Sequence, residues 1–501
     1  MKTPDKQDLL HDIPNACGQG VAESAPDDAD VFLRQFLPIS RHLRVLDPQV
    51  RVIIGDKGAG KSHLFQALKF PKGRALLSEL AKKQGYLTAP LERSAWLVGF
   101  ETRGITFPPS DLMDSFSRDK GPDDLRQLWL GLLVRVLIGE SKVSAAALPA
   151  PLARVLSSPT WDLPLLVRTV QDQRNQAELF AVLDALDKKL TETDEYVFVT
   201  YDELDRVSPN NWATVRAVLQ GLVQFWSVYS RRWQRIRSKI FLRRDLYEHA
   251  ALRGPDIAKI AWNPVDIFWN TGELYALLFK RLANASDSWR DYLSKGRLQL
   301  EKHPTLGWRP SGQDEQDYAA IVKYMFGEYM GHDVRRGLTL RWIPNHLKDG
   351  HGRVFPRPLL MLIQEAARLE TRDQRAKGNH KIHYTALRGA LDRVSEFRVK
   401  ELTDEEFPWL RTLERTFQIH PFQVPAMRKD VLKVLRIDRI DWSKEKARPP
   451  ETEPNALLDY LAELGVVSFR SDGRIDVGDL YLKGLHLRRK GGVARPKSAR
   501  H

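Results

Sequence analysis

Residues 50–63 read VRVIIGDKGAGKSH. The β-branched run at 50–54 predicts a short buried strand, and the apolar pattern at 62–68 predicts a helix. Between them, residues 55–62 match G-x-x-x-x-G-K-[ST] in full, the pattern of a phosphate-binding loop. Glycines let backbone N–H groups curl around phosphates, and the helix N-terminus adds partial positive charge. Strand, spacing and helix together favour this site over a chance glycine-rich turn.

The loop also predicts the roles of individual side chains. Lys61 is expected to reach the β- and γ-phosphates, and Ser62 is expected to ligate Mg²⁺. ATP and Mg²⁺ are therefore the predicted cofactors, although no base-specific motif separates ATP from GTP. The residues predicted to bind the nucleotide are Gly55, Asp56, Lys57, Gly58, Ala59, Gly60, Lys61, Ser62 and His63.

A pair of acids follows the apolar run at 196–201, which ends in Asp202 and Glu203. This is the pattern of the magnesium-binding strand of P-loop proteins. Asp202 would hold Mg²⁺, and Glu203 would orient and deprotonate the attacking water. The alternative is a strand that ends in solvated acids. Arg206 is either structural or reaches a neighbouring subunit.

Two further segments place arginines near the predicted nucleotide. The strand expected at 239–242 ends in Arg243 and Arg244, and a strand between the two already predicted would place its tip at the γ-phosphate. Either arginine would then sense whether that phosphate is present. Arg357 precedes a helix with Pro358 in its first turn, and it would face the nucleotide from a lid. Surface arginines in a basic chain are the alternative in both cases.

Strands alternate with helices up to about residue 270, which predicts an α/β fold with a mostly parallel sheet. Further on, a helix at 455–464 precedes two β-rich runs around Asp472-Gly473, a strong hairpin signal that suggests a winged helix. The Ala-, Pro- and Ser-rich segment 141–165 is interpreted as a linker or an excursion of the chain. The predicted domains are a disordered leader (1–28), a P-loop NTPase domain (29–270, with an insertion at about 105–190), a helical lid (271–400) and a winged-helix domain with a basic tail (401–501).

Composition narrows the class of protein. The net charge of +14 raises the expectation of an acidic partner such as DNA or RNA. The chain has a single cysteine, no long apolar run and no apolar segment at its N-terminus, so we expect a cytoplasmic protein with no membrane partner. Two basic segments could contact phosphates, or could simply be solvated. They are residues 231–239 and a tail that contains Lys483, Arg488, Arg489, Lys490, Arg495, Lys497 and Arg500.

With these motifs placed, the chain resembles the AAA+/STAND side of the P-loop ATPases, and more narrowly a group of bacterial stand-alone P-loop ATPases. The stretches that carry the resemblance are 52–65, 197–206, 239–247, 262–282, 355–367 and 457–493. The resemblance implies an ASCE-type parallel sheet, a helical lid and a C-terminal winged helix. It also implies sensor roles for Arg243, Arg244 and Arg357. The separation of Lys61 from Asp202 exceeds that of compact AAA+ modules, and an Arg-Arg pair replaces their small polar sensor.

Relatives of this kind often act as nucleotide switches in bacterial antiphage defence or in regulation, commonly as oligomers. We therefore expect an ATP hydrolase whose bound state drives assembly with itself or with a protein effector. The rival hypothesis is a nucleic-acid-binding regulator that uses ATP as a switch through its winged helix and basic tail. A P-loop kinase and a non-hydrolysing scaffold are weaker alternatives, because Glu203 suits water activation and no acceptor-site signature is present.

Overall fold

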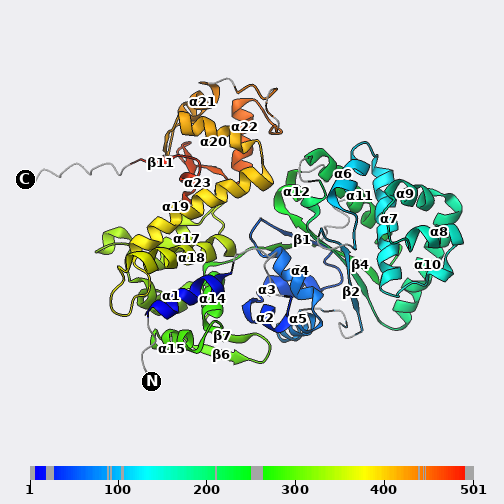
Figure 1. The fold of residues 1–501 in the computed structure, drawn as a ribbon, viewed down its shortest axis with the longest axis horizontal. Coiled ribbons are helices and arrows are strands. Elements are labelled where there is room, and N and C mark those ends of the chain that lie inside the picture. The colour runs from blue at the N-terminus through cyan, green and yellow to red at the C-terminus, as the bar shows by residue number, and fades with distance from the viewer. Residues whose placement is uncertain are drawn as a thin grey trace, which may run out of the picture. The chain divides into compact units, whose positions relative to one another are not determined.

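The computed structural model describes residues 6–18, 27–86, 88, 90, 93–102, 106–208, 211–249, 263–437, 440–443, 445 and 447–490. The chain divides into two compact units, whose elements are labelled in Figure 1. The sheet unit comprises Ala22–Phe268 with Pro304–Gly307. The helical unit comprises Met1–Val21, Trp269–His303 and Trp308–His501.

The sheet unit is built on five parallel strands in the order β2-β3-β4-β1-β5. They are β1 (Val52–Gly55), β2 (Ala95–Phe100), β3 (Val197–Tyr201), β4 (Ile236–Arg243) and β5 (Val265–Ile267). Every residue of β1, β3 and β4 is buried, as expected for parallel strands that are covered on both faces. The predicted α/β fold is therefore confirmed, and β4 lies between β1 and β3 as expected.

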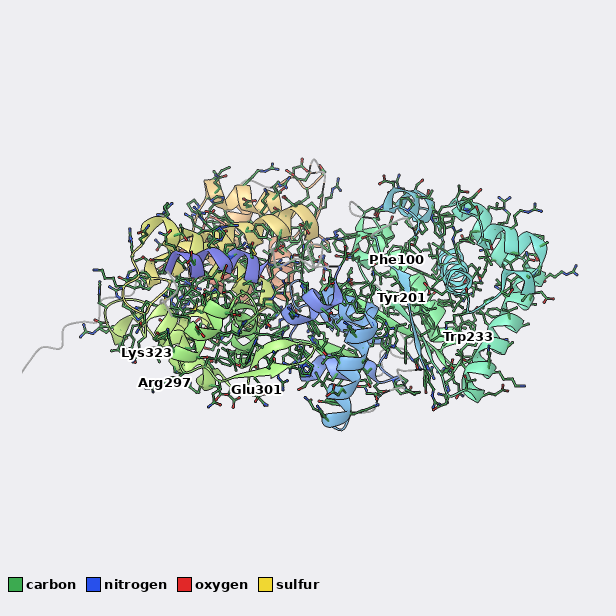
Figure 2. All side chains as sticks on the ribbon, turned by 60° about the horizontal axis from the view of Figure 1, so that its bottom comes forward. Phe100, Tyr201, Trp233, Arg297, Glu301 and Lys323 are labelled. Atoms are coloured by element: carbon green, nitrogen blue, oxygen red, sulfur yellow. The ribbon has the colours of Figure 1, made fainter. Side chains whose placement is uncertain are left out.

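Helices and aromatic side chains fill the core of the sheet unit. Helix α7 (Pro122–Gly139) packs against α11 (Trp212–Tyr229), and the Trp129 indole donates to the Val218 carbonyl at 2.9 Å. Trp129 also meets the rings of Phe100 and Tyr201 edge-on, with centroids 5.7 and 5.6 Å away. Phe100 and Tyr201 are labelled in Figure 2. The other helices of this unit are α2 (Ala29–Gln35), α3 (Ser40–Leu43), α4 (Lys61–Lys69), α5 (Pro71–Lys83), α6 (Ser110–Ser117), α8 (Ala150–Leu156), α9 (Leu163–Gln171), α10 (Gln173–Glu192) and α12 (Arg244–His249).

The segment interpreted as a linker is instead partly helical. Residues 141–165 contain α8 and the start of α9, and Leu148, Leu152 and Leu156 are buried in the core of the sheet unit. Alanine is a strong helix former and proline suits a first helical turn, so the composition that suggested a linker is also compatible with short helices.

The helical unit joins the start of the chain to its second half. Its main helices are α1 (Lys6–Cys17), α14 (Thr271–Ala283), α15 (Asp287–Lys295), α16 (Ala319–Phe326), α17 (Thr339–His346), α18 (Pro356–Asp373) and α19 (Tyr384–Glu401). A hairpin of β6 (Leu300–His303) and β7 (Gly307–Pro310) interrupts them. None of the helices in the described ranges has the length and apolarity needed to span a bilayer.

The prediction of a disordered leader at 1–28 is wrong over Lys6–Cys17. This segment is helix α1, which packs against α14 and α18 and buries Leu9, Leu10 and Ile13. The Arg281 guanidinium donates to the Cys17 carbonyl at 2.6 Å, so a side chain from α14 satisfies the end of α1. The helix is only 12 residues long and contains Pro14, so its apolar periodicity is a weak signal in the sequence.

The last part of the helical unit has the element order of a winged helix. The elements are α20 (Leu410–Ile419), β8 (Gln423–Val424), α21 (Arg428–Ile437), α22 (Pro454–Glu463), β9 (Val467–Phe469) and β10 (Ile475–Val477). Strands β9 and β10 pair antiparallel, which confirms the hairpin predicted around Asp472-Gly473. Helix α23 (Asp479–Leu482) and β11 (Arg488–Arg489) follow, and β11 pairs with β8.

Candidate nucleotide-binding site

The glycine-rich loop connects the end of β1 at Gly55 to the start of α4 at Lys61. Gly58 and Gly60 have φ values of 84° and 93°, a left-handed conformation that side-chain-bearing residues rarely adopt. Ala59 is fully buried beneath the loop, and its N–H donates to the Asp56 carbonyl at 3.1 Å. The loop therefore has the strand–turn–helix geometry that the motif requires.

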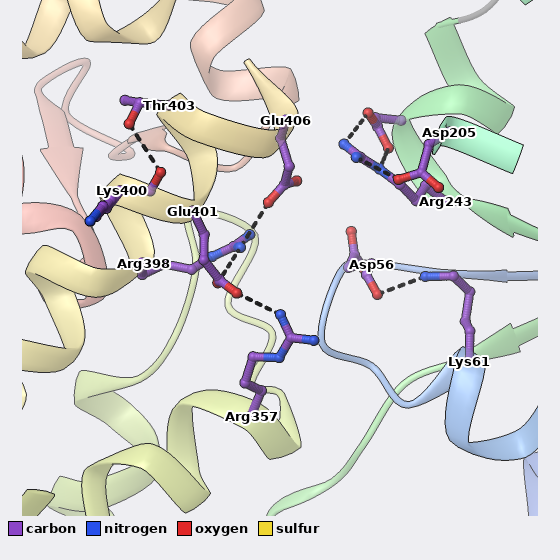
Figure 3. A network of polar contacts seen from close by, with 11 residues as sticks. Asp56, Lys61, Asp205, Arg243, Arg357, Arg398, Lys400, Glu401, Thr403 and Glu406 are labelled. Atoms are coloured by element: carbon purple, nitrogen blue, oxygen red, sulfur yellow. Dashed lines mark hydrogen bonds and ion pairs between the residues drawn. The ribbon is translucent and has the colours of Figure 1, made fainter. Parts of the chain in front are cut away.

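Lys61 lies over this loop and is largely buried. Its ammonium group donates to the carbonyl of Gly55 at 2.8 Å and to that of Asp56 at 3.0 Å, and the second contact is drawn in Figure 3. Burial lowers the pKa of Lys61, while the nearby carboxylate of Asp202 opposes this shift. The cation is thus held by uncharged oxygens of the loop itself.

Ser62 and Asp202, the two predicted magnesium ligands, come together from α4 and the end of β3. The Ser62 side chain hydrogen-bonds the Asp202 carboxylate, which is buried. The backbone N–H of Asp202 donates to the Phe100 carbonyl at 3.1 Å, so the Asp202 backbone is fixed to the end of β2. Burial raises the pKa of Asp202 to about 6, although hydrogen bonds from Glu203 and Ser62 act in the opposite direction. A hydroxyl beside a buried carboxylate is an oxygen donor set that suits Mg²⁺.

Glu203 follows Asp202 with a left-handed backbone, φ 55°. One oxygen of its carboxylate accepts from the Thr102 hydroxyl and from the Thr102 N–H, the latter at 3.2 Å. The other oxygen lies 3.8 Å from Arg206. The predicted general base is therefore bound to donors at the end of β2 and on the turn that follows β3.

Arg243 ends β4, the strand between β1 and β3, and is buried. Its guanidinium contacts Asp205 at 3.2 Å and Asp245 at 2.8 Å (Figure 3). Burial would raise the pKa of Asp205, but Arg243 outweighs it, so the pKa of Asp205 is lowered. Arg243 also acts electrostatically on Lys61, which places its charge near the loop.

Arg244 joins the glycine-rich loop to the edge strand β5. It contacts Asp56 at 3.2 Å and also pairs with Asp266 of β5. Burial opposes the charge of Arg244, but these two carboxylates raise its pKa above the ordinary value. The structure thus assigns both arginines carboxylate partners, and their predicted role as γ-phosphate sensors stays a prediction.

The remaining predicted residues have other partners. The His63 ring stacks on Phe32 of α2, with centroids 6.2 Å apart. Within the helical unit, Arg357 donates to Glu401 at 2.5 Å (Figure 3). Arg398 contacts the same carboxylate at 3.2 Å. The role of Arg357 toward a nucleotide stays a prediction.

The basic segment 231–239 is mostly committed to the sheet unit itself. Arg232 pairs with Asp184 at 2.5 Å, and Arg235 pairs with Asp194 at 2.9 Å. Arg237 and Lys239 are buried within β4, and burial lowers the pKa of Arg237 to about 10. This segment is therefore a structural feature of the fold rather than a free phosphate-binding surface.

The two helices that follow β8 in the winged helix differ in charge: α21 carries Arg428, Lys429, Lys433 and Arg436, whereas α22 is acidic. Helix α22 contains Asp459 and Glu463 and has no lysine or arginine, and Glu453 caps its N-terminus. In the hairpin that follows, Arg470 pairs with Asp476 at 2.8 Å. The predicted tail begins inside the fold, because Arg488 and Arg489 form β11, and Arg489 contacts Asp479 at 2.9 Å. Lys483 and Lys490 also lie within the described residues, whereas Arg495, Lys497 and Arg500 lie outside them.

Two residues of this site were missed by sequence reasoning. Thr102 follows β2, and its contact with Glu203 would have required knowledge that β2 and β3 are neighbours. Asp266 belongs to β5, which is only three residues long and therefore gives a weak periodic signal. In both cases the two residues in contact are far apart in the sequence, and the parallel sheet brings them together.

Comparisons with known proteins do not assign a family to the chain. No family model matches it, and a search of curated proteins found no match. Among solved structures, it is similar to the Aeropyrum pernix ORC2 protein in ADPNP and ADP complexes, with 14% identity, TM-score 0.29 and coverage of 93% of this chain and 98% of that one. Cdc6p from Pyrobaculum aerophilum gives 14% identity, TM-score 0.31 and coverage of 94% and 96%.

The Aeropyrum pernix ORC1 protein in complex with DNA gives 12% identity and TM-score 0.33, covering 96% of this chain and 97% of that one. These likenesses are too distant to carry an argument about function. The P-loop assignment therefore rests on the strand order and on the contacts around Lys61, Ser62 and Asp202.

Proposed function

We propose that this protein binds ATP with Mg²⁺ and hydrolyses it, acting as a nucleotide-controlled switch. One observation supports this above all others. The parallel sheet brings the hydroxyl of Ser62 to the buried carboxylate of Asp202, beside the glycine-rich loop that carries Lys61. A glycine-rich loop, a lysine, a hydroxyl and a carboxylate are the parts that P-loop proteins use to hold a nucleotide and its metal.

The proposed chemistry assigns each residue one role. Lys61 would exchange its two backbone carbonyl partners for the β- and γ-phosphate oxygens, and its full charge would then face an anion. Ser62 and Asp202 would hold Mg²⁺, which when bound neutralises charge on the transferred phosphoryl group. Glu203 would leave Thr102 and accept a proton from the attacking water. Arg243, at the tip of β4, would respond to the γ-phosphate.

The experiment separates binding from hydrolysis. Affinity for a fluorescent ATP analogue and steady-state phosphate release are measured for the wild type, Lys61→Ala and Glu203→Gln. We expect Lys61→Ala to lose binding, and Glu203→Gln to bind normally but to hydrolyse at least a hundredfold more slowly, since general base catalysis contributes about 10²–10⁴-fold. Hydrolysis at the wild-type rate by Glu203→Gln would remove Glu203 from the role of base. Competition by GTP identifies the preferred base.

We infer that the bound nucleotide controls assembly, as the resemblance to STAND-type ATPases suggests. Assembly would involve other copies of the chain or a protein effector, with antiphage defence as the proposed setting. Light scattering of Glu203→Gln with ATP, compared with ADP, tests the first part. A stable oligomer with ATP alone would support it, and an unchanged mass in both nucleotides would contradict it.

A second candidate function is a nucleic-acid-binding regulator that uses ATP as a switch. The observation in its favour is the charge, since 78 lysines and arginines oppose 64 acids. ATPase activity with and without plasmid DNA tests this candidate. DNA stimulation that Lys61→Ala and Glu203→Gln both lose would support it, and activity indifferent to DNA would favour control by a protein partner.

A further inference from the structure

Residues 328–339 of the helical unit form a short hairpin that is held by its own backbone. Tyr329 and Leu338 form an antiparallel bridge, and the Met330 N–H donates to the Gly337 carbonyl at 3.0 Å. At the tip, Val334–Arg336 form one 3-10 turn, which Asp333 caps by accepting from the Arg335 N–H at 2.9 Å. Gly337 closes the turn with φ 84°, a value that favours glycine. The tip therefore has a defined conformation without any partner.

The tip combines an exposed aliphatic side chain with two arginines. Val334 is 67% exposed, and Leu338 is 39% exposed. Arg335 and Arg336 flank Val334 on one side and are themselves exposed. Within the described part of the chain, neither arginine forms an ion pair. Folding gives no reason to place an uncovered valine beside two cations, whereas a partner that is both anionic and partly apolar would cover all three.

The base of the hairpin is anchored to α19 and adds to its positive charge. Arg388 donates to the Met330 carbonyl at 2.6 Å, and its guanidinium lies over the Tyr384 ring, 5.6 Å from the centroid. The hairpin also contains two acids: Glu328 pairs with Lys323 at 2.6 Å, and Asp333 caps the tip, so the tip itself carries two arginines against one carboxylate. The hairpin therefore presents a rigid, cationic tip.

Several arginines elsewhere in the described chain are already engaged by the fold. Arg232 and Arg235 are paired and Arg237 is buried within the sheet unit, and Arg428 of the basic helix α21 pairs with Asp459 at 2.8 Å. In the wing, Arg470 and Arg474 each contact an aspartate at 2.8 Å. Among the described residues, the hairpin tip is thus a basic surface whose charges are not already satisfied by the fold.

We propose that the tip of hairpin 328–339 enters the minor groove of double-stranded DNA. Arg335 and Arg336 would lie along the groove and its phosphates, and Val334 would contact the sugars and base edges. Arginines accumulate in narrow A·T-rich minor grooves, where the negative potential is strongest, and aliphatic side chains commonly accompany them. Double-stranded RNA has a wide, shallow minor groove that would not enclose such a tip. The inference deepens the nucleic-acid candidate but does not require ATP hydrolysis.

The test measures binding of the full chain to a fluorescent 20-base-pair A·T-rich duplex. Fluorescence anisotropy reports binding at KCl concentrations between 50 and 300 mM, with and without ATP and Mg²⁺. Each phosphate contact contributes about −0.9 to the slope of log K against log salt concentration. Arg335→Ala/Arg336→Ala should therefore make this slope less steep by about 1.8. We also expect the double variant to bind more than tenfold more weakly at 100 mM salt. Val334→Ser should weaken binding severalfold and leave the slope unchanged, because it removes apolar contact alone.

The matched control is Arg470→Ala/Arg474→Ala, which removes the same charge from a place where it is paired. We expect this control to bind like the wild type. Wild-type affinity and slope in Arg335→Ala/Arg336→Ala would overturn the proposal, as would an equal loss in the control pair or no binding of the wild type at 50 mM KCl. Equal competition by duplex RNA or by a G·C-rich duplex would overturn the minor-groove assignment.

The variants change exposed tip residues, so their melting temperatures should match that of the wild type; the binding comparison is made only between variants that meet this condition. If the double variant does not keep the wild-type melting temperature, Gly337→Ala provides a second approach. It strains the turn and leaves every charge in place. We expect it to weaken DNA binding and to remain as soluble as the wild type. Lys61→Ala should still bind duplex DNA in the absence of nucleotide, so failure of the ATPase proposal and failure of this one are distinguishable.

Discussion

Replacing Thr102 by valine removes the hydroxyl that donates to Glu203 and keeps the shape of the side chain. The Thr102 N–H still donates to the same oxygen at 3.2 Å, so the restraint on Glu203 is weakened rather than abolished. A hydrogen bond to a charged group contributes about 1.5–3 kcal/mol. Taking the lower end, because one donor remains, the conformations in which Glu203 can accept a proton from water become about tenfold more populated.

We therefore expect Thr102→Val to hydrolyse ATP about tenfold faster than the wild type in single-turnover experiments at saturating nucleotide. Thr102→Ser is the matched control, since it retains a hydroxyl at the end of β2 and should stay near the wild-type rate. Equal or slower turnover by Thr102→Val would refute the reasoning. It would mean that the contact positions Glu203 for catalysis instead of restraining it.

Three further predictions concern the stability of the sheet unit. Burial lowers the pKa of His42 to about 3 in the folded protein, whereas the ordinary pKa of histidine is about 6.5. At a pH below about 6.5 the unfolded chain therefore takes up a proton that the folded protein does not. The free energy of unfolding then falls by about 1.4 kcal/mol for each unit by which the pH is lowered. Urea unfolding at pH 7 and pH 5 should show this loss, about 2 kcal/mol, and His42→Phe should reduce it; identical pH dependence in both proteins would contradict the assignment. Lys239→Met removes the ammonium that donates to the Asp47 and Val50 carbonyls at 2.6 Å each. The Asp47 carbonyl keeps the Val50 N–H as a donor at 3.0 Å, but the buried Val50 carbonyl loses the Lys239 donor, so the change should cost about 2 kcal/mol in the same assay. A variant as stable as the wild type would show that the Val50 carbonyl finds another donor. Gly99→Ala would place a Cβ 2.4 Å from Val199 Cγ1 and should lower the free energy of unfolding by about 1–3 kcal/mol. Gly139→Ala, which has open space around the new Cβ, is the control and should leave stability nearly unchanged. Equal melting temperatures for the two variants would argue against the close contact between the strands.

Local patterns predicted the parts of the site that lie within one strand or one turn. The P-loop at 55–62, the strand that ends at Asp202 and the strand that ends at Arg243 all have the predicted structure. Their positions next to one another follow from the preference of βα units for parallel sheets, so the meeting of Ser62 with Asp202 could be expected. These features depend on short-range periodicity and on one topological rule.

Contacts between distant segments could not be predicted in the same way. The arginines of 231–239 were visible, but Asp184 and Asp194, which neutralise two of them, lie on or just after a different helix and give no local sign of pairing. The Arg244 contact with Asp266 likewise depends on β5 lying beside β1. Charge composition reports how many cations a chain carries, whereas only the fold determines which of them remain available.

Helix α1 has a consequence for the order in which the chain can fold during synthesis. It belongs to the helical unit, but the next elements of that unit, from α14 onward, are translated only after Ala22–Phe268 of the sheet unit. The apolar side chains Leu9, Leu10 and Ile13 therefore leave the ribosome more than two hundred residues before the surface that buries them. During this interval α1 presents an uncovered hydrophobic segment of the kind that chaperones bind. The sheet unit is in effect an insertion within the discontinuous helical unit.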